Sequence, residues 1–170
     1  IGRLDPVKNH AGLIRAYAMA GEKIQRARLV IVGDGPERDR LKALIWGLEG
    51  IPAPILTGYR EDIERFYGIF DIFVLNSFAE GMSNTLLEAM ASGLPAICTP
   101  AGANTDLIID CDRGRIVPAD NDARLSQTIM EFAGSTQLFH RLAASARDFV
   151  ISRHSLSHMI SEYISLYRRL

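Results

Sequence analysis

The loop between residues 76 and 84 combines residue types that could bind an anionic ligand. It contains the carboxylate of Glu80 and a flexible glycine, and it links an apolar run at 71–75 to a helical pattern at 85–91. The first turn of a helix presents unpaired N–H groups and a partial positive charge, which together favour a phosphate group. Three polar residues occupy that position: Ser83, Asn84 and Thr85. We therefore predict a phosphate site at the start of this helix.

Two glutamates near this phosphate site have a spacing that would suit the sugars on either side of a diphosphate, as in a sugar nucleotide. Glu88 lies four residues past Asn84, which places it about 6 Å further along a helix. A diphosphate and its neighbouring ribose are separated by a similar distance, so Glu88 could accept hydrogen bonds from two ribose hydroxyls. Glu80 could reach hydroxyls on the other side of the phosphates. For each glutamate alone, the alternative is an ordinary solvated side chain.

Two cations near the N-terminus strengthen this prediction. Arg3 and Lys8 flank the exit of the first expected strand. The carboxyl ends of parallel strands meet at one edge of the sheet, where ligands bind. A guanidinium and an ammonium that converge there on two phosphates would offset their charge without a metal ion. The alternative is a pair of exposed side chains at a helix start, where the helix dipole makes positive charge slightly unfavourable.

Regularly alternating strand and helix patterns must position these side chains. The sequence predicts that a strand with its body upstream ends near Ile1, and that a helix follows at 11–20. Further strands are predicted at 29–32, 54–58, 71–75, 94–98 and 114–117, and helices up to about Leu48 and at 62–67 and 85–91. Strands that are apolar on both faces, each followed by a helix, are typical of a buried parallel sheet. We predict a doubly wound, Rossmann-like α/β domain of about six strands with helices on both faces.

The chain is predicted to be helical from Asn121 onward, as a C-terminal extension of this domain. Apolar residues there recur at helical spacing and form one stripe: Leu156, Met159, Ile160, Tyr163, Ile164 and Tyr167. We expect the stripe to pack the last helix onto the sheet domain. The alternative is a docking surface for a partner protein.

Composition narrows the functional classes. The 170 residues, 48% of them apolar, suffice for a single domain spanning 1–170. Lysine and arginine number 19 against 20 acidic residues, so the chain lacks the positive field that attracts nucleic acid. Cys98 and Cys111 have no metal-site or disulfide-framework spacing, which favours free thiols in a reducing compartment. With no apolar run long enough to cross a bilayer, we expect a soluble cytoplasmic domain, cut from a longer protein because it begins at Ile1.

Three short motifs point to other chemistry and are discounted. The Asp-x-Asp triplets at 110–112 and 120–122 match a metal-binding pattern, but they precede turn-like residues, so we expect caps and turns. Gly33 and Gly35 begin like a dinucleotide fingerprint, yet Arg38 stands where its third glycine belongs. We therefore expect neither a metal ion nor a cofactor.

Four blocks in order resemble the C-terminal, donor-binding domain of the retaining GT-B glycosyltransferases of family four, the glycosyl transferases group one. The segment 80–95 is similar to the family's Glu-x7-Glu signature, with Glu80 and Glu88 as its two glutamates. The other blocks are 2–4 with Lys8, 33–36 and 58–59. The resemblance spans residues 1 to about 122, and the order and spacing of the blocks make it specific.

The resemblance implies a role for each site residue. Arg3 and Lys8 would bind the diphosphate, Glu88 would hold the ribose, and Glu80 would contact the hydroxyls of the donor sugar. The remaining donor contacts would come from the backbone at Met82, Ser83, Asn84 and Thr85, and from Tyr59 and Arg60 beside the base. Arg3, Lys8 and Glu80 would carry the catalytic contribution of this domain, a metal-independent transfer with retention of anomeric configuration.

The resemblance also implies partners. The donor is expected to be a nucleotide diphosphate sugar, most commonly UDP-linked, and the acceptor a glycan, a lipid or a small molecule, as in polysaccharide biosynthesis. An N-terminal acceptor-binding domain, absent from this fragment, would complete the enzyme and could hold it peripherally at a membrane surface. The fragment alone is expected to bind donor without turnover. A nucleotide-sugar epimerase of similar architecture and a non-catalytic interaction module are the alternatives.

Overall fold

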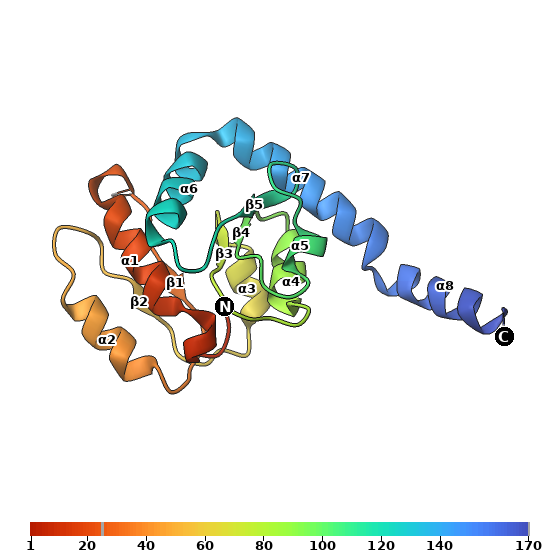
Figure 1. The fold of residues 1–170 in the computed structure, drawn as a ribbon, viewed down its shortest axis with the longest axis horizontal. Helices are drawn as coiled ribbons and strands as arrows, with labels where there is room; N and C mark the ends of the chain where they lie inside the picture. The colour runs from red at the N-terminus through yellow and green to blue at the C-terminus, as the bar shows by residue number, and fades with distance from the viewer. Residues whose placement is uncertain (25, 170) are drawn as a thin grey trace.

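In a computed structural model, which describes residues 1–24 and 26–169, the chain alternates strands and helices (Figure 1). The strands are β1 (Val30–Ile31), β2 (Ile55–Leu56), β3 (Phe73–Leu75), β4 (Ala96–Cys98) and β5 (Gly114–Ile116). The helices are α1 (His10–Ala20), α2 (Arg38–Trp46), α3 (Ile63–Tyr67), α4 (Asn84–Ala91), α5 (Asn104–Leu107), α6 (Asp122–Gly134), α7 (Thr136–Arg153) and α8 (Leu156–Tyr167). Two 3₁₀ turns, η1 (Pro6–Lys8) and η2 (Gly21–Ile24), flank α1.

The described strands form two parallel sheets. β1 pairs with β2, and β3, β4 and β5 pair in that order, all in parallel register. The predicted parallel α/β class is confirmed, because each predicted strand after the first has its counterpart here. The arrangement differs from the continuous sheet that the sequence suggested, since β1 and β3 are not paired with each other within the described residues.

Helices cover both faces of the larger sheet. Successive side chains of a strand point to opposite faces. Ala96 and Cys98 of β4 pack into one apolar cluster with α4 and α7, whereas Ile97 between them packs into another with α1 and α6. All three side chains are fully buried. This two-sided burial is why β4 is apolar at every position.

The carboxyl ends of the strands gather the loops that the sequence singled out. Gly2 donates its N–H to the carbonyl of Val32 at 2.9 Å, and Leu4 donates to Asp34 at 2.9 Å. Gly33 has φ 139°, and a Cβ there would lie 1.9 Å from the Gly2 carbonyl oxygen. Only glycine permits this approach of two backbones. The approach fixes Arg3 at the carboxyl end of β1.

The last helix does not pack as predicted. None of the residues of α8 is buried, and the apolar stripe from Leu156 to Tyr167 is 46–69% exposed. The helix contacts α7 and projects from the body of the molecule (Figure 1). The prediction that the stripe packs on the sheet domain is therefore wrong. Helical spacing shows that one face is apolar, but it does not show what covers that face.

Within the described residues, no helix combines the length and the hydropathy that crossing a bilayer requires.

Candidate functional site

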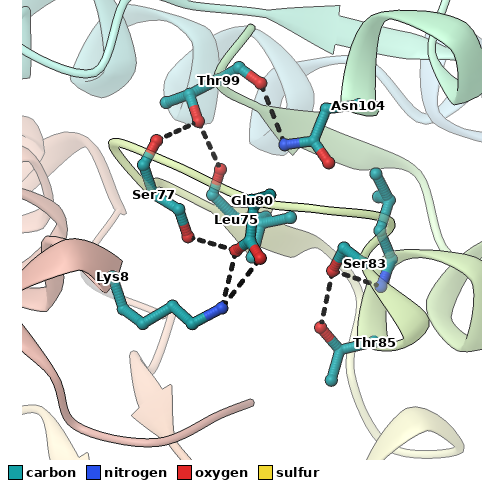
Figure 2. Close-up of polar contacts among 9 residues, drawn as sticks. Lys8, Leu75, Ser77, Glu80, Ser83, Thr85, Thr99 and Asn104 are labelled. Carbon is teal, nitrogen blue, oxygen red and sulfur yellow. Dashed lines mark hydrogen bonds and ion pairs between the residues drawn. The ribbon is translucent and has the colours of Figure 1, made fainter. Parts of the chain in front are cut away.

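Lys8 and Glu80 form an ion pair where the carboxyl end of β3 meets η1 (Figure 2). Lys8 Nζ donates to both carboxylate oxygens of Glu80, at 2.8 and 2.9 Å. Ser77 Oγ donates to Glu80 Oε1 at 2.6 Å. The Glu80 side chain is only 8% exposed and that of Lys8 is 27% exposed. These two residues, 72 positions apart, thus lie together at one edge of the sheet. The sequence analysis expected both at this edge as ligand contacts, but it did not expect them to bind each other.

A second layer of hydrogen bonds holds the Glu80 loop in place (Figure 2). Thr99 Oγ1, just past β4, donates to the carbonyl of Ser77 at 2.5 Å, and Asn104 Nδ2 donates to the carbonyl of Thr99 at 3.1 Å. Ala103 N–H donates to the Gly81 carbonyl at 3.0 Å. Thr99 and Asn104 are buried, so these bonds are shielded from water. The loop that bears Glu80 is thus tied to the neighbouring strand exit.

Helix α4 begins beside this ion pair. Ser83 is its N-cap, with Oγ accepting from the Leu86 N–H at 3.3 Å. Thr85 Oγ1 lies 3.1 Å from the same oxygen. Because Ser83 caps the Leu86 amide, the amides of Asn84 and Thr85 at the start of the helix remain for an external acceptor. This first turn and the ammonium of Lys8 are the groups that could hold an anion.

Glu88 lies one turn further along α4 and is held by a tyrosine. Tyr67 Oη, from the end of α3, donates to Glu88 Oε2 at 2.7 Å, and it lies 3.4 Å from the carbonyl oxygen of Thr85. Burial, followed by the hydrogen bond and the charge of Glu88, raises the pKa of Tyr67. The phenol therefore stays protonated and acts as the donor. Glu88 as a whole remains exposed, so its carboxylate can accept further hydrogen bonds.

The other predicted site residues lie on the same rim with different partners. Arg3 is 72% exposed, and its Nε lies 2.8 Å from Asp5 Oδ2. Tyr59 is 72% exposed, and Arg60 pairs with Asp62 at 2.8 Å while lying over the Phe66 ring. Met82 and Asn84 are also exposed. The structure therefore joins Lys8 to Glu80 but does not place Arg3 in contact with either.

Sequence reasoning assigned no site role to four residues that position the site: Tyr67, Ser77, Thr99 and Asn104. Ser77 and Thr99 come just after β3 and β4 at the carboxyl edge, and this position is the signal that could have drawn attention to them. Tyr67, at the end of α3, and Asn104, at the start of α5, have no such signal. Their residue types alone do not indicate a functional site, because single hydroxyls and amides are common in loops.

Among residues 1–24 and 26–169, no three His, Cys, Asp or Glu side chains are grouped so that they could hold a metal ion.

A model of the family described as glycosyl transferases group 1 matches residues 1–149. The chain belongs to this family. This chain resembles the N-acetylgalactosamine-N,N'-diacetylbacillosaminyl-diphospho-undecaprenol 4-alpha-N-acetylgalactosaminyltransferase of Campylobacter jejuni. The two are 36% identical over 129 residues, which cover 75% of this chain and 34% of that protein. This chain is also 33% identical over 156 residues to the GDP-mannose-dependent alpha-mannosyltransferase of Mycobacterium tuberculosis, covering 90% of this chain and 38% of that protein.

A solved structure of similar fold superposes on this chain. The crystal structure of HepE from Anabaena in complex with UDP superposes with a TM-score of 0.91 at 23% sequence identity, covering 100% of this chain and 48% of that one. The predicted Rossmann-like fold is thereby confirmed, and the family model confirms the predicted family. The group 1 chain spans between about a third and a half of the length of these relatives.

Proposed function

We propose that the chain binds the nucleotide diphosphate sugar of a retaining, metal-independent glycosyltransferase. The diphosphate rests on the first-turn amides of α4 and against Lys8. Glu88 takes the ribose hydroxyls, and Glu80 takes hydroxyls of the sugar. The observation that carries the proposal is the Lys8–Glu80 pair beside the start of α4, because it places a cation, an acceptor and free amides around one point.

Such a site stabilises the departing diphosphate electrostatically. Fixed N–H dipoles and a held ammonium need no reorganisation as negative charge develops on the leaving group. Arg3 can contribute a second positive charge after it leaves Asp5, since that ion pair is exposed and therefore weak. Tyr59 and Arg60 border the place of the base.

The remaining parts of the enzyme are proposals about the longer protein. Its relatives are about two to three times as long as this chain, and we place the acceptor site in an N-terminal domain that closes over the donor. The acceptor is a glycan, a lipid or a small molecule. The Campylobacter relative is named for a diphospho-undecaprenol acceptor, which favours an enzyme that works in the cytoplasm at the membrane surface. On its own, the chain binds donor and does not transfer the sugar.

Calorimetric titration with UDP, GDP and ADP tests the proposal. One relative is named for GDP-mannose and one is solved with UDP, so both bases are compared. We expect one nucleotide to bind, and we expect Glu88→Gln to weaken it at least about tenfold, or 1.4 kcal/mol. Glu49→Gln, an exposed carboxylate in the loop after α2, is the matched control and leaves affinity unchanged. Absence of binding by all three nucleotides, or equal effects of the two substitutions, would contradict the donor site.

A further inference from the structure

Asn9 has a backbone conformation that residues other than glycine rarely adopt. Its φ and ψ are 48° and 42°, in the left-handed region. Asparagine is one of the few residues that enter this region, because its short polar side chain can form hydrogen bonds locally. Asn9 ends η1 and begins α1, and its N–H donates to the Pro6 carbonyl at 3.1 Å. The chain therefore changes direction directly after Lys8.

The side chain of Asn9 holds this turn in place. Its Oδ1 accepts from the Gly12 N–H at 3.2 Å, and its Nδ2 donates to the Ala119 carbonyl at 2.8 Å. A Cβ on Gly12 would lie 2.7 Å from Asn9 Nδ2, so the carboxamide fills the space that this glycine leaves. Asn9 is buried. The carboxamide thus ties the start of α1 to the loop after β5.

The loop that bears Glu80 contacts the same turn at three places. Alternate residues of the loop each pair with one of three consecutive residues of the turn. The pairs are Asn76 Nδ2 with the Asn9 carbonyl at 3.3 Å, the Phe78 N–H with the Val7 carbonyl at 2.8 Å, and the Glu80 carboxylate with the Lys8 ammonium. Both chain neighbours of Lys8 are therefore anchored to the loop that its side chain reaches.

A fixed backbone matters for a lysine in particular. The lysine side chain has many rotamers and loses much conformational entropy when it is ordered. Anchors on both sides of Lys8 reduce the positions that its ammonium can occupy. Unusual backbone conformations persist only where surrounding contacts hold them, and they gather at functional sites. Here the unusual residue, Asn9, adjoins the cation of the site described above.

We propose that Asn9 is a positioning residue, whose left-handed conformation aims the Lys8 ammonium at Glu80 before a donor binds. The carboxamide of Asn9 is engaged within the protein, so the residue acts through Lys8. The inference rests on the proposed function for its effect on affinity, because the aimed ammonium strengthens binding only if the diphosphate lies beside it. The positioning itself is a property of the ligand-free chain.

Two substitutions of Asn9 separate its backbone conformation from its side chain. Both remove the carboxamide, but glycine adopts the left-handed region freely, whereas alanine is strained there. We expect Asn9→Ala to weaken the nucleoside diphosphate at least about tenfold in calorimetry. We expect Asn9→Gly to stay within about threefold of the unaltered chain.

The Lys8 ammonium can also be observed directly in the ligand-free chain. The sequence contains three lysines, and the other two, Lys23 and Lys42, are exposed. In NMR spectra of the chain labelled with nitrogen-15 lysine, we expect the Lys8 ammonium protons to exchange with water at least about tenfold more slowly than those of the other two, because charge-assisted hydrogen bonds to Glu80 hold them. Asn9→Ala should abolish this protection, and Asn9→Gly should keep it.

Asn121→Ala is the matched control. Asn121 is the N-cap of α6, where its Oδ1 accepts from the Arg124 N–H at 2.8 Å, but its φ of −119° is ordinary. Loss of this cap should lower Tm by about 2–4 °C and leave both affinity and Lys8 exchange unchanged. Thermal unfolding followed by circular dichroism verifies that each variant is folded at the temperature of the other measurements.

Three results would overturn the proposal. Unchanged Lys8 exchange in a folded Asn9→Ala chain would show that the turn does not aim the ammonium. Loss of the protection in a folded Asn9→Gly chain would assign the positioning to the carboxamide, and this holds even where Asn9→Ala does not fold. An equal loss of affinity in Asn121→Ala would show a general effect of stability.

The same measurements distinguish this proposal from the donor site on which it rests. If no nucleotide binds the unaltered chain while Lys8 exchange responds to Asn9 as described, the positioning is supported and the donor site is contradicted. If a nucleotide binds but neither its affinity nor Lys8 exchange changes in Asn9→Ala, the donor site stands and the positioning role is overturned.

Discussion

Lys8 is held in position before any ligand arrives. Glu80 binds its ammonium through both oxygens, and Ser77 fixes the carboxylate in turn. An incoming phosphate would therefore meet an already oriented cation and would share it with Glu80. A partly buried pair of this kind loses less to solvent screening than an exposed one. The arrangement favours precise placement of one positive charge over a general attraction for anions.

Lys8→Met tests the role of this cation. The substitution keeps much of the side-chain volume and removes the charge, so we expect nucleoside diphosphate affinity to fall at least about tenfold. Lys42→Met, at an exposed position of α2, should leave affinity unchanged. Calorimetry with the nucleotide that binds the unaltered chain measures both. Undiminished affinity in Lys8→Met would place the phosphates elsewhere.

Glu88 can be tested through the ligand as well as the protein. If its carboxylate accepts from ribose hydroxyls, Glu88→Gln should weaken a ribonucleotide severalfold more than the matching 2′-deoxynucleotide, because the deoxy ligand lacks one of the hydroxyls. Tyr67→Phe removes the donor that orients Glu88, and it should show a smaller effect of the same sign. Equal losses with both ligands would mean that Glu88 does not bind the 2′-hydroxyl.

At the scale of elements, the site depends on two loops that pack backbone against backbone. Gly102 has φ 54°, and a Cβ there would lie 2.0 Å from the Glu80 carbonyl oxygen. The loop after β4 thus presses directly on the loop after β3. This contact explains how a short segment can hold Glu80 at the edge of the sheet.

Gly102→Ala should disturb both stability and binding. Gly50 also has positive φ, at 72°, but nothing lies near its missing Cβ. Gly50→Ala therefore measures the backbone strain alone, about 1 kcal/mol. We expect Gly102→Ala to cost at least about 1–2 kcal/mol more in the free energy of unfolding and to weaken the nucleotide as well. Urea denaturation and calorimetry on the pair provide the comparison, and equal costs would mean that the two loops can separate freely.

The elements themselves were largely predictable from the sequence. Apolar runs bounded by turn residues predicted β1 to β5, and the carboxyl-edge rule predicted that Lys8 and Glu80 lie at the same edge of the sheet, but not that they bind each other. The gap between β1 and β3 was not predictable, because strand pairing depends on a neighbour that a local pattern does not contain. The role of Tyr67 was not predictable for a related reason, because its hydroxyl reaches Glu88 only where α3 ends beside α4.

At the scale of the whole molecule, buried titratable groups make stability depend on pH. Burial, followed by the charges of the Ile1 amino group and Lys8, lowers the pKa of His10 from 6.5 to about 4, although Asp5 opposes the shift. The unfolded chain therefore takes up this proton at a higher pH than the folded chain does. Stability from this residue is complete above about pH 6.5 and is lost as the pH falls toward 4.

Between pH 7 and 5, we expect the unaltered chain to lose about 2 kcal/mol more stability than His10→Leu does. Urea denaturation at a series of pH values measures the difference. His140→Leu removes an exposed histidine and should follow the unaltered chain. Parallel pH curves for the unaltered chain and His10→Leu would show that His10 is protonated in the folded state as easily as in the unfolded one.

Because α8 projects from the body of the molecule, its end is a convenient attachment site for a label. Its far end, around Tyr167, is exposed and belongs to a helix whose described contact is with α7, well apart from the rim that carries Glu80 and Glu88. A fluorophore or a surface tether attached there would report tumbling, or immobilise the chain, while leaving the proposed donor site open to solution.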